Sequence, residues 1–318
     1  MFNDHFLSRF TDIINAASQI LIVVHEYPDL DAVGSALALK FALDKQGYQS
    51  DIWVPENLNS SFDFLPGVSD ILRKFPSFKK IDCVVFLDSS HKTRVAKHEQ
   101  LDVILENAQT INLDHHCDNS RFADLNYVTD ISSVGELLSV LFNKLSWPIC
   151  LNMATCLYAA ICFDTGRFAY SNTTSQTMHV VSGLLDTGVD PYTVYTHIYE
   201  NQSVMSFKLL KLALDRLVVC REKGYAYTSI PLSAPKAPFK LVDFIRQLKG
   251  IDVFMVIQAV NSRKVKVNLR SKQEFDVSAF ANQFGGGGHV RASGLKFEDK
   301  SLEDCIQIMT DALDKELS

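Results

Sequence analysis

Several broad classes of protein are excluded by what this sequence lacks. Its apolar runs stay short of the ~18–20 residues that a membrane-spanning helix needs, and its amino terminus does not show the basic and then apolar pattern of a signal peptide. The seven cysteines form no Cys-x-x-Cys pair, so neither a structural zinc site nor a disulfide framework is expected. Low-complexity tracts and solenoid repeats are also absent. We therefore expect a globular protein of the reducing cytoplasm that makes no membrane contact.

The sequence also lacks a surplus of basic residues. With 31 Lys and Arg against 37 Asp and Glu, its formal net charge is −6, which argues against a protein that coats long nucleic acids non-specifically. A small anionic ligand is compatible with that charge if local cations or metal ions hold it. The 318 residues, 47% of them hydrophobic, suffice for two domains of ordinary size.

Short apolar runs alternate with helical segments through the first 190 residues. Residues 20–24, 83–87 and 110–113 are runs of the kind that form buried strands, and residues 50–54 form a further strand candidate. Apolar positions at helical spacing define the expected helices, at 2–18, 32–46, 134–145, 153–163 and 174–187. This alternation predicts an α/β fold, with an N-terminal domain over residues 1–190 that contains a doubly wound, mostly parallel sheet with right-handed crossovers.

The pattern changes after residue 190. We expect a helical connector over residues 191–217 and a smaller C-terminal α/β domain over residues 218–318. The elements expected after the connector are strands at 217–220, 225–230, 252–260 and 264–269, and helices at 239–248, 276–284 and 301–317. The last two strands should form a hairpin.

Metal-capable side chains stand at four separate ends of the expected strands and helices. They are His25 with Asp29 and Asp31, then Asp88, then Asp114-His115-His116, and finally Asp164. An aspartate after a strand is often a helix N-cap, which is a sufficient explanation for any one of them. Together, however, they should meet at one edge of the sheet. Clustered carboxylates repel one another unless a cation neutralises them, and a carboxylate and imidazole set without thiolates suits two ions such as Mn²⁺.

These residues resemble the DHH phosphoesterase superfamily. His25-x-x-x-Asp29-x-Asp31, Asp88, Asp114-His115-His116 and Asp164-Thr165-Gly166 are similar to its four motifs in order and spacing. The second half, with Leu269-Arg270-Ser271 and four glycines before His289-x-Arg291, resembles the associated DHHA1 domain. Within the superfamily, the stand-alone nanoRNase and pAp-phosphatase group of bacteria is the most similar. The resemblance implies a DHH domain, a DHHA1 domain and an active site in the cleft between them.

The resemblance also implies roles for the metal-capable residues. His25 and Asp29 would bind one metal, Asp88 would bridge to the second, and Asp31, His115 and Asp164 would complete the second site. The implied cofactors are two divalent ions, with Mn²⁺ first and Mg²⁺ or Co²⁺ as alternatives. The sequence departs from the family pattern at Tyr27 and Leu30; neither side chain is expected to bind metal, but both could reshape the pocket.

The chemistry implied by such a site is metal-assisted hydrolysis of a phosphoester. A water that bridges two metals about 3.5–4 Å apart becomes hydroxide near neutral pH and attacks phosphorus in line, while the metals neutralise charge that grows on the phosphoryl oxygens. Besides Asp88, two residues would serve catalysis: Asp114 would orient an imidazole, and His116 would face the phosphate as a contact or general acid. Thiolate ligation or redox control by Cys117 is conceivable, but we expect a buried spectator.

Four consecutive glycines, Gly285 to Gly288, precede His289. They are explained either by a flexible loop or by a backbone that approaches a ligand closely and offers N–H groups to an anion. In the second interpretation Gly286, Gly287, Gly288 and His289, with Arg270, Ser271 and Arg291, bind the substrate. Arg270 and His289 are the stronger candidates to clamp a terminal phosphate, and Arg291 is a weaker one because it could be a solvated strand residue.

The family resemblance predicts an exonuclease-like phosphodiesterase that hydrolyses very short RNA or DNA oligonucleotides to mononucleotides, and pAp to AMP. A phosphodiesterase for cyclic or linear dinucleotides is the alternative within the superfamily. Manganese pyrophosphatase is disfavoured because its second domain lacks a Gly-Gly-Gly-His loop, and a processive single-strand exonuclease because such relatives are longer. A non-catalytic nucleotide sensor would have lost metal ligands, whereas all are present here. The sequence leaves the oligomeric state open, with a homodimer among the options.

Overall fold

The computed structural model describes residues 2–56, 58, 60–76, 80–95, 97–235 and 241–317, and it divides the chain into two compact units. The first unit covers Met1–Asn201 and the second covers Gln202–Ser318. Among the described residues, no helix combines the length and apolar character needed to cross a bilayer. Each unit has its own sheet and its own core, so the two are described separately.

The first unit is built on a five-stranded sheet in which every neighbouring pair is parallel. Its strands, in chain order, are β1 (Ile20–Val23), β2 (Ser50–Trp53), β3 (Cys83–Leu87), β4 (Gln109–Asp114) and β5 (Leu125–Val128). Their order across the sheet is β2-β1-β3-β4-β5. Strand β2 therefore lies on one side of β1 and β3 on the other, so the strand order reverses between β1 and β3. Sheets of this kind bind ligands at the carboxyl ends of the strands at such a point.

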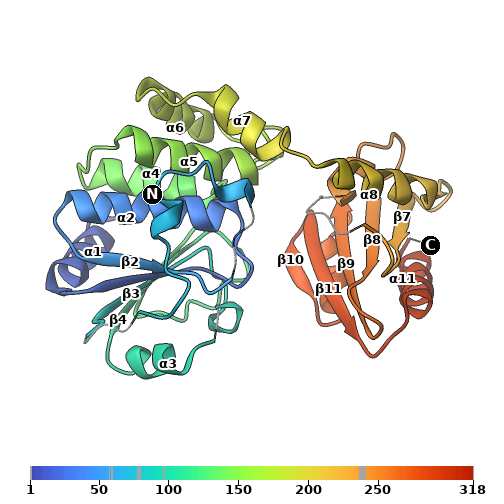
Figure 1. The fold of residues 1–318 in the computed structure, drawn as a ribbon, viewed down its shortest axis with the longest axis horizontal. Coiled ribbons are helices and arrows are strands. Elements are labelled where there is room, and N and C mark those ends of the chain that lie inside the picture. Colours follow the sequence, from blue (N-terminus) through green and yellow to red (C-terminus); the bar gives the residue numbers. More distant parts are fainter. Residues whose placement is uncertain are drawn as a thin grey trace. The chain divides into compact units, whose positions relative to one another are not determined.

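Helices cover both faces of this sheet. The helices of the first unit are α1 (Asp4–Ala16), α2 (Leu30–Lys45), α3 (Glu99–Leu105), α4 (Val134–Lys144), α5 (Leu151–Asp164), α6 (Ser175–Asp186) and α7 (Pro191–Tyr199), with 3-10 turns at Ser60–Phe62, Val68–Asp70 and Lys92–Arg94. Helices α2, α4 and α5 lie over one face and α3 over the other (Figure 1). Alternate residues of β1 enter the two cores: Ile20 and Ile22 face α2, whereas Leu21 and Val23 face α3.

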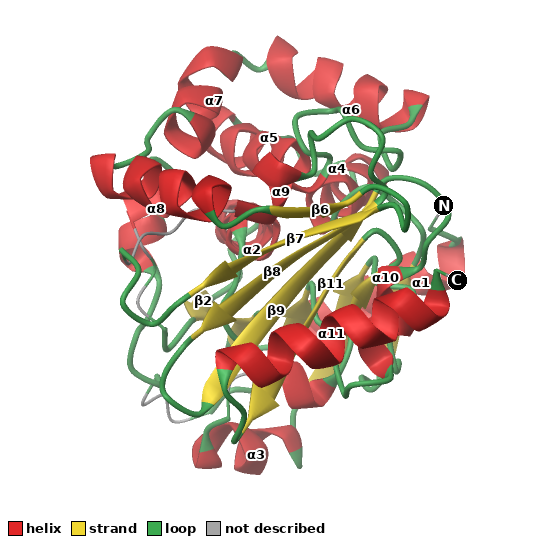
Figure 2. Cartoon of the chain, turned by 90° about the vertical axis from the view of Figure 1, so that its right-hand side faces the viewer, coloured by secondary structure: helices red, strands yellow, loops and turns green. Residues whose placement is uncertain are grey.

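The second unit contains a six-stranded sheet in the order β10-β11-β9-β8-β7-β6. Its strands are β6 (Val218–Cys220), β7 (Tyr225–Ile230), β8 (Val253–Ala259), β9 (Lys264–Ser271), β10 (Gly287–His289) and β11 (Ala292–Glu298), and its helices are α8 (Val204–Asp215), α9 (Leu241–Ile245), α10 (Val277–Asn282) and α11 (Leu302–Glu316). All neighbours are antiparallel except β7 and β8. Helix α11 lies across one face of the sheet (Figure 2), while α8 and α9 pack on the other face, against β7 and β8.

The predicted α/β fold, with a parallel first sheet and a smaller second domain, is confirmed. Within it, the sequence missed α3, β5, β10 and β11. Strand β5 has four half-buried residues and β11 contains Ser293 and Gly294, so neither shows the apolar run of a buried strand. The predicted connector over 191–217 consists of two helices, of which α7 packs in the first core and α8 in the second. Of the helix expected over 239–248, residues 239 and 240 lie outside the described residues.

Candidate metal centre

Three of the metal-capable residues of the first unit stand at the carboxyl ends of β1, β3 and β4, which are neighbouring strands of the sheet. His25 comes two residues after β1, Asp88 directly follows β3, and Asp114 is the last residue of β4. Asp164 is the last residue of α5. The sequence-predicted set is therefore brought to one edge of the sheet by elements that are up to about 140 residues apart in the chain.

Asp88 lies at the centre of this cluster. Its Oδ2 is 3.5 Å from His25 Nε2, and its Oδ1 is 3.4 Å from His115 Nε2 and 3.5 Å from His116 Nδ1. The residue is 3% exposed and adopts a left-handed backbone conformation with φ of 53°, which is uncommon for a residue other than glycine. Its Oδ1 is buried without a hydrogen-bond partner among the described residues. Burial acts to raise the pKa of Asp88, but the hydrogen bonds of His115 and His25 and the charge of His116 hold that pKa well below its usual range, so the side chain is a carboxylate that a cation can bind.

His115 faces the carboxylates through one ring nitrogen. Its Nε2 lies 3.4 Å from Asp164 Oδ2 and 3.9 Å from Asp31 Oδ2. The other nitrogen, Nδ1, is 3.2 Å from the carbonyl oxygen of Ile131. If Nδ1 carries the proton and donates to that carbonyl, Nε2 offers its lone pair to the carboxylate side, which is the arrangement of a metal-binding imidazole.

Asp29 and Asp31 owe their positions to helix starts. Asp29 is the N-cap of α2 and accepts from the backbone N–H groups of Asp31 and Ala32 through Oδ1. Asp31 is fully buried and accepts from the backbone N–H groups of Val134 and Gly135 at 2.8 and 2.9 Å, in the first turn of α4. The N-cap explanation therefore holds for Asp29, but it does not exclude metal binding by the same side chain.

The carboxylate of Asp114 contacts the imidazole of His116. Its Oδ1 accepts from His116 Nδ1 at 2.8 Å, and its Oδ2 accepts from Asn119 Nδ2 at 2.5 Å. The oriented ring is thus that of His116. Burial acts to raise the pKa of Asp114, but the hydrogen bond and charge of His116 outweigh it and lower that pKa.

The electrostatics of the cluster fit divalent cations. Burial and the neighbouring Asp88 raise the pKa of Asp31 to about 7, and burial and Asp31 raise the pKa of Asp164 well above its usual range. Burial acts to lower the pKa of His25, but the hydrogen bond and charge of Asp88 raise it to about 9. Excess negative charge is thus balanced by protons on the surrounding groups, and a metal ion would displace them.

Potential ligand atoms gather in sets that match the predicted ones. His25, Asp29 and Asp88 have such atoms within 4.8 Å of one another, and so do Asp31, His115 and Asp164. A third set joins Asp88 and Asp114 to His115 and His116. The potential ligand atoms of these sets are carboxylate oxygens and imidazole nitrogens. Such ligands suit Mn²⁺ or Mg²⁺ better than an ion that prefers thiolates.

Two features near these sets were not predicted. Cys117 is exposed, so the expectation of a buried thiol is wrong, because the chain turns outward directly after His116. Asn119 was not considered, yet its Nδ2 also donates to Asn112 Oδ1 at 2.8 Å. Asn119 therefore ties Asp114 to the interior of β4, and its polar character in a loop was the available signal.

In the second unit, Arg270 and His289 stand in one row across the sheet. Ala292 on β11 pairs with Arg270 on β9 and with His289 on β10. Directly paired residues point to the same face, and a strand spacing of ~4.8 Å places Arg270 and His289 roughly 10 Å apart. Arg270 is held by Asp243 of α9, whose Oδ1 is 2.8 Å from its Nε.

Ser271 and Arg291 are oriented differently from that row. Ser271 follows Arg270 on β9 and therefore points to the opposite face, where it is fully buried. Arg291 lies in the two-residue turn between β10 and β11, not on a strand, and its Nη1 donates to the carbonyl oxygen of Phe275 at 3.1 Å.

The glycine run contributes an edge strand to the second sheet. A Cβ on Gly286 would lie 2.4 Å from the carbonyl oxygen of Gly294, and one on Gly288 would lie 2.6 Å from that of Ala292. Close approach of this segment to β11 therefore requires glycine at both positions. A Cβ on Gly287 would meet only Asn282 Oδ1, at 3.4 Å, so packing explains Gly287 less well.

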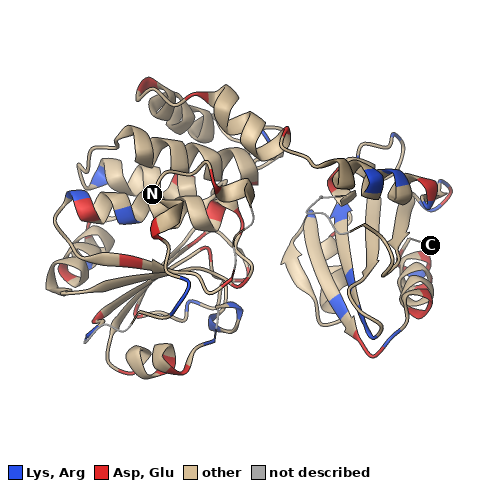
Figure 3. Cartoon of the chain, in the orientation of Figure 1, with Lys and Arg blue, Asp and Glu red and all other residues tan. Residues whose placement is uncertain are grey.

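Three polar residues share the face of Arg270 and were not predicted. Asn268 lies two positions before Arg270 on β9, and Lys266, two positions earlier, pairs with Lys296 of β11. Figure 3 shows basic positions along these strands. Burial and the charges of Lys296 and Arg270 lower the pKa of Lys266. The two-residue period of a strand would have placed these side chains beside Arg270.

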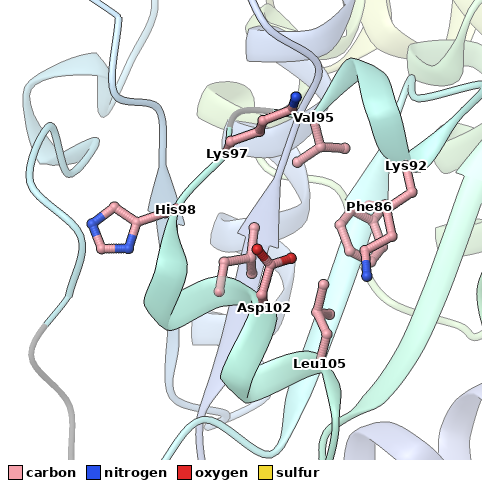
Figure 4. Close-up of a pocket in the computed structure, with 8 residues that line it drawn as sticks. Phe86, Lys92, Val95, Lys97, His98, Asp102 and Leu105 are labelled. Atoms are coloured by element: carbon pink, nitrogen blue, oxygen red, sulfur yellow. The ribbon is translucent and has the colours of Figure 1, made fainter.

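Two hollows in the first unit lie apart from the metal-capable residues. The pocket in Figure 4, between β3 and α3, has a volume of about 30 Å³ and is lined by Phe86, His98 and Leu105 among others. That volume suits about one water molecule. A wider groove of about 600 Å³ lies between α4 and α6, and its lining includes no carboxylate. Neither hollow competes with the cluster as a site for a metal ion.

Two family models match the chain. The model of the DHH family, N-terminal domain, matches residues 19–161, and the model of the DHHA1 domain matches residues 223–317. Each match falls within one of the two units.

Relatives match nearly the whole length of the chain. The chain is 30% identical over 307 residues to the bifunctional oligoribonuclease and PAP phosphatase NrnA of Thermus thermophilus, covering 94% of this chain and 90% of that protein. It is 26% identical over 324 residues to an uncharacterized protein of Mycoplasma genitalium, covering 98% and 97%. A solved structure of an exopolyphosphatase-related protein from Bacteroides fragilis is similar with a TM-score of 0.91 at 26% identity, covering 99% of this chain and 97% of that one.

Proposed function

This chain belongs to the DHH family of phosphoesterases and carries a DHHA1 domain, and from that premise we propose that it hydrolyses very short oligonucleotides to mononucleotides and pAp to AMP. The observation that carries the proposal is the position of Asp88. One of its carboxylate oxygens faces His25 and the other faces His115. Such a carboxylate is suited to bridge two divalent ions, Mn²⁺ in the first place.

The proposed ligands fall on the two sides of Asp88. His25 and Asp29 would hold one ion, and Asp31, His115 and Asp164 would hold the other, since these sets have their potential ligand atoms within 4.8 Å of one another. Bound there, the ions would polarise the phosphoryl group and promote attack by water. The charge pattern supports this assignment. Burial and the neighbouring carboxylates raise the pKa of Asp31 and of Asp164, and a bound cation would favour the ionised form of both.

His116 is placed to handle the phosphate or the leaving group. Its Nδ1 donates to Asp114 Oδ1 at 2.8 Å, which fixes the plane of the ring. Burial acts to lower the pKa of His116, but the hydrogen bond of Asp114 and the charges of Asp88 and Asp114 raise it, which favours the protonated ring. A protonated imidazole can bind a phosphoryl oxygen or give its proton to the departing oxygen.

The second unit would hold the nucleotide. Arg270 and His289 share one row of the sheet, with Asn268 and Lys266 on the same face of β9, and a guanidinium with an imidazole suits a terminal phosphate. The name of the Thermus thermophilus relative, an oligoribonuclease and PAP phosphatase, supports the same class of substrate.

A comparison of initial rates tests the proposal. Purified protein with Mn²⁺ is incubated with pAp, pApA, a five-nucleotide RNA and a cyclic dinucleotide. We expect hydrolysis of pApA and of the short RNA to mononucleotides, together with release of phosphate from pAp. A much higher rate on the cyclic dinucleotide would assign the alternative phosphodiesterase activity. A protein that binds these nucleotides, hydrolyses none of them and binds no Mn²⁺ would be a nucleotide sensor.

A further inference from the structure

One short segment, residues 131–136, contacts two of the proposed ligands of the second ion. The carbonyl oxygen of Ile131 lies 3.2 Å from His115 Nδ1. The backbone N–H groups of Val134 and Gly135 donate to the two carboxylate oxygens of Asp31 at 2.8 and 2.9 Å. The placement of this segment therefore sets both the rotation of the His115 ring and the direction of the Asp31 carboxylate.

Asn172 connects the same segment to the third proposed ligand. Its Nδ2 donates to the carbonyl oxygen of Ser132 at 3.1 Å and to that of Asp164 at 3.2 Å. Asp164 ends α5, and the loop after it contains two non-glycine residues in the left-handed region, Arg167 and Phe168, with φ of 65° and 63°. Such a loop is held in place only by its surroundings, and the amide of Asn172 is one of the contacts that hold it.

Glu136 anchors the segment from the other side. It is 1% exposed, and its Oε2 accepts from the hydroxyl of Ser132 and from Thr177 Oγ1, the latter at 2.9 Å. Its Oε1 has no hydrogen-bond partner among the described residues, and no basic side chain forms an ion pair with it there. A buried carboxylate in this condition weakens a core, so packing alone does not account for it.

We propose that Glu136 and Asn172 are positioning residues of the metal centre. Glu136 fixes the hydroxyl of Ser132, and Asn172 joins the carbonyl of the same residue to the backbone of Asp164. Together they keep Asp31, His115 and Asp164 at the spacing that one divalent ion needs. Among the described residues, no hydrogen bond or ion pair joins Glu136 or Asn172 to His25, Asp29 or Asp88, so we expect that set to keep its ion when they are replaced. The inference rests on the proposed function, because it assumes that these two sets bind metal.

Mn²⁺ binding to the full-length protein tests the inference without reference to activity. Stoichiometry and affinities are measured by titration, with electron paramagnetic resonance to follow free and bound Mn²⁺. The variants are Glu136→Leu, which removes the acceptor, Glu136→Gln, which retains one, and Asn172→Ala. The matched control is Asn126→Ala. The side chain of Asn126 also bonds two backbone groups, both of Ala123, but among the described residues it has no hydrogen bond to a proposed metal ligand.

We expect one ion to bind Glu136→Leu and Asn172→Ala with the wild-type affinity, and the second to bind about 10- to 100-fold more weakly, the usual effect of removing a group that orients a ligand. Glu136→Gln should recover most of that loss, and Asn126→Ala should bind both ions normally. Asn172 is on a half-buried loop, so its variant remains informative if Glu136→Leu does not fold. Two wild-type affinities in folded Asn172→Ala would overturn the inference and leave the proposed function standing. If the wild-type protein binds no Mn²⁺, both the inference and the proposed function are wrong.

Discussion

Asp114 and His116 form a buried carboxylate–imidazole pair in which Oδ1 of the aspartate accepts from Nδ1 of the histidine at 2.8 Å. Asp114 is fully buried, and its other oxygen is occupied by Asn119. The pair gives the two adjacent histidines separate orientations, since His115 turns Nε2 toward Asp31, Asp88 and Asp164. We therefore propose separate roles for the three residues: His115 binds metal, His116 contacts the substrate and Asp114 orients His116.

Replacing Asp114 by asparagine should lower turnover while metal binding persists. The amide removes the negative charge that orients His116 and raises its pKa, and losses of about 10- to 100-fold are usual for such supporting carboxylates. The check is kcat on pApA alongside a Mn²⁺ titration. A variant that lost Mn²⁺ and kept the wild-type kcat once saturated with metal would show that Asp114 serves the metal ions and not His116.

Replacing Asp88 by asparagine should remove nearly all activity and reduce the number of bound ions. Asparagine tolerates the left-handed backbone at this position, so the change acts on the charge and not on the fold. If the transition state loses several kcal/mol of stabilisation by the metal ions, kcat should decrease by roughly 10³-fold or more. The assay uses the variant at saturating Mn²⁺, and wild-type turnover under those conditions would rule out the bridging role.

The sequence singled out the metal-capable residues because several of them stand at the end of a strand or helix that is recognisable by itself; that they bind metal stays a prediction. His25, Asp88 and Asp114 follow apolar runs, and a parallel sheet brings the ends of such runs together whatever their separation in the chain. Glu136 and Asn172 could not be found in this way. Their relevance depends on hydrogen bonds to Ser132, and those exist only once α4 and the loop after α5 have packed.

In the second unit, the sequence interpretation failed for a different reason. Alternation along β9 already implies that Ser271 points away from Arg270 and that Asn268 points with it. The sequence interpretation followed the family motif at this point and grouped Arg270 with Ser271. The glycine run was missed as a strand because residues without side chains carry no periodicity, and its pairing with β11 is a purely tertiary feature.

Replacing Arg270 by alanine should impair hydrolysis of pAp and pApA far more than hydrolysis of a generic aryl phosphodiester. Hydrogen bonds to a charged group contribute about 1.5–3 kcal/mol, which corresponds to roughly 10- to 150-fold in kcat/KM on the nucleotide substrates. Arg291→Ala is the comparison, because the guanidinium of Arg291 is bound to Phe275 in a turn, and its effect should be smaller. Equal losses on nucleotide and aryl substrates would count against a clamp.

Mn²⁺ should stabilise the first unit and leave the second unchanged. An ion at 100 times its dissociation constant adds about 2.7 kcal/mol, which raises Tm by roughly 5–11 °C for a domain of 150–250 residues. Differential scanning calorimetry with Mn²⁺ and with a chelator measures the shift, and Asp88→Asn serves as the control that should shift much less. If the melting of the second unit alone responded to Mn²⁺, the metal centre would be assigned to the wrong unit.

Alanine substitutions in the glycine run separate packing from substrate binding. Gly286→Ala places a Cβ 2.4 Å from the carbonyl oxygen of Gly294, and overpacking of this kind destabilises a domain by typically 1–3 kcal/mol. Gly287→Ala meets no backbone atom within 4 Å, and its φ is not in the left-handed region, so its stability should be close to that of the wild type.

Gly287→Ala is therefore the informative variant. If the backbone of β10 approaches a phosphate, a methyl group at Gly287 obstructs that approach, and KM for pApA should rise about tenfold, equivalent to about 1.4 kcal/mol, while the free energy of unfolding stays constant. If the glycines serve only the contact between β10 and β11, Gly286→Ala should unfold the second unit more readily and Gly287→Ala should have wild-type KM. Urea unfolding and steady-state kinetics on the same two variants decide between these explanations, because packing and binding act here through neighbouring but different residues.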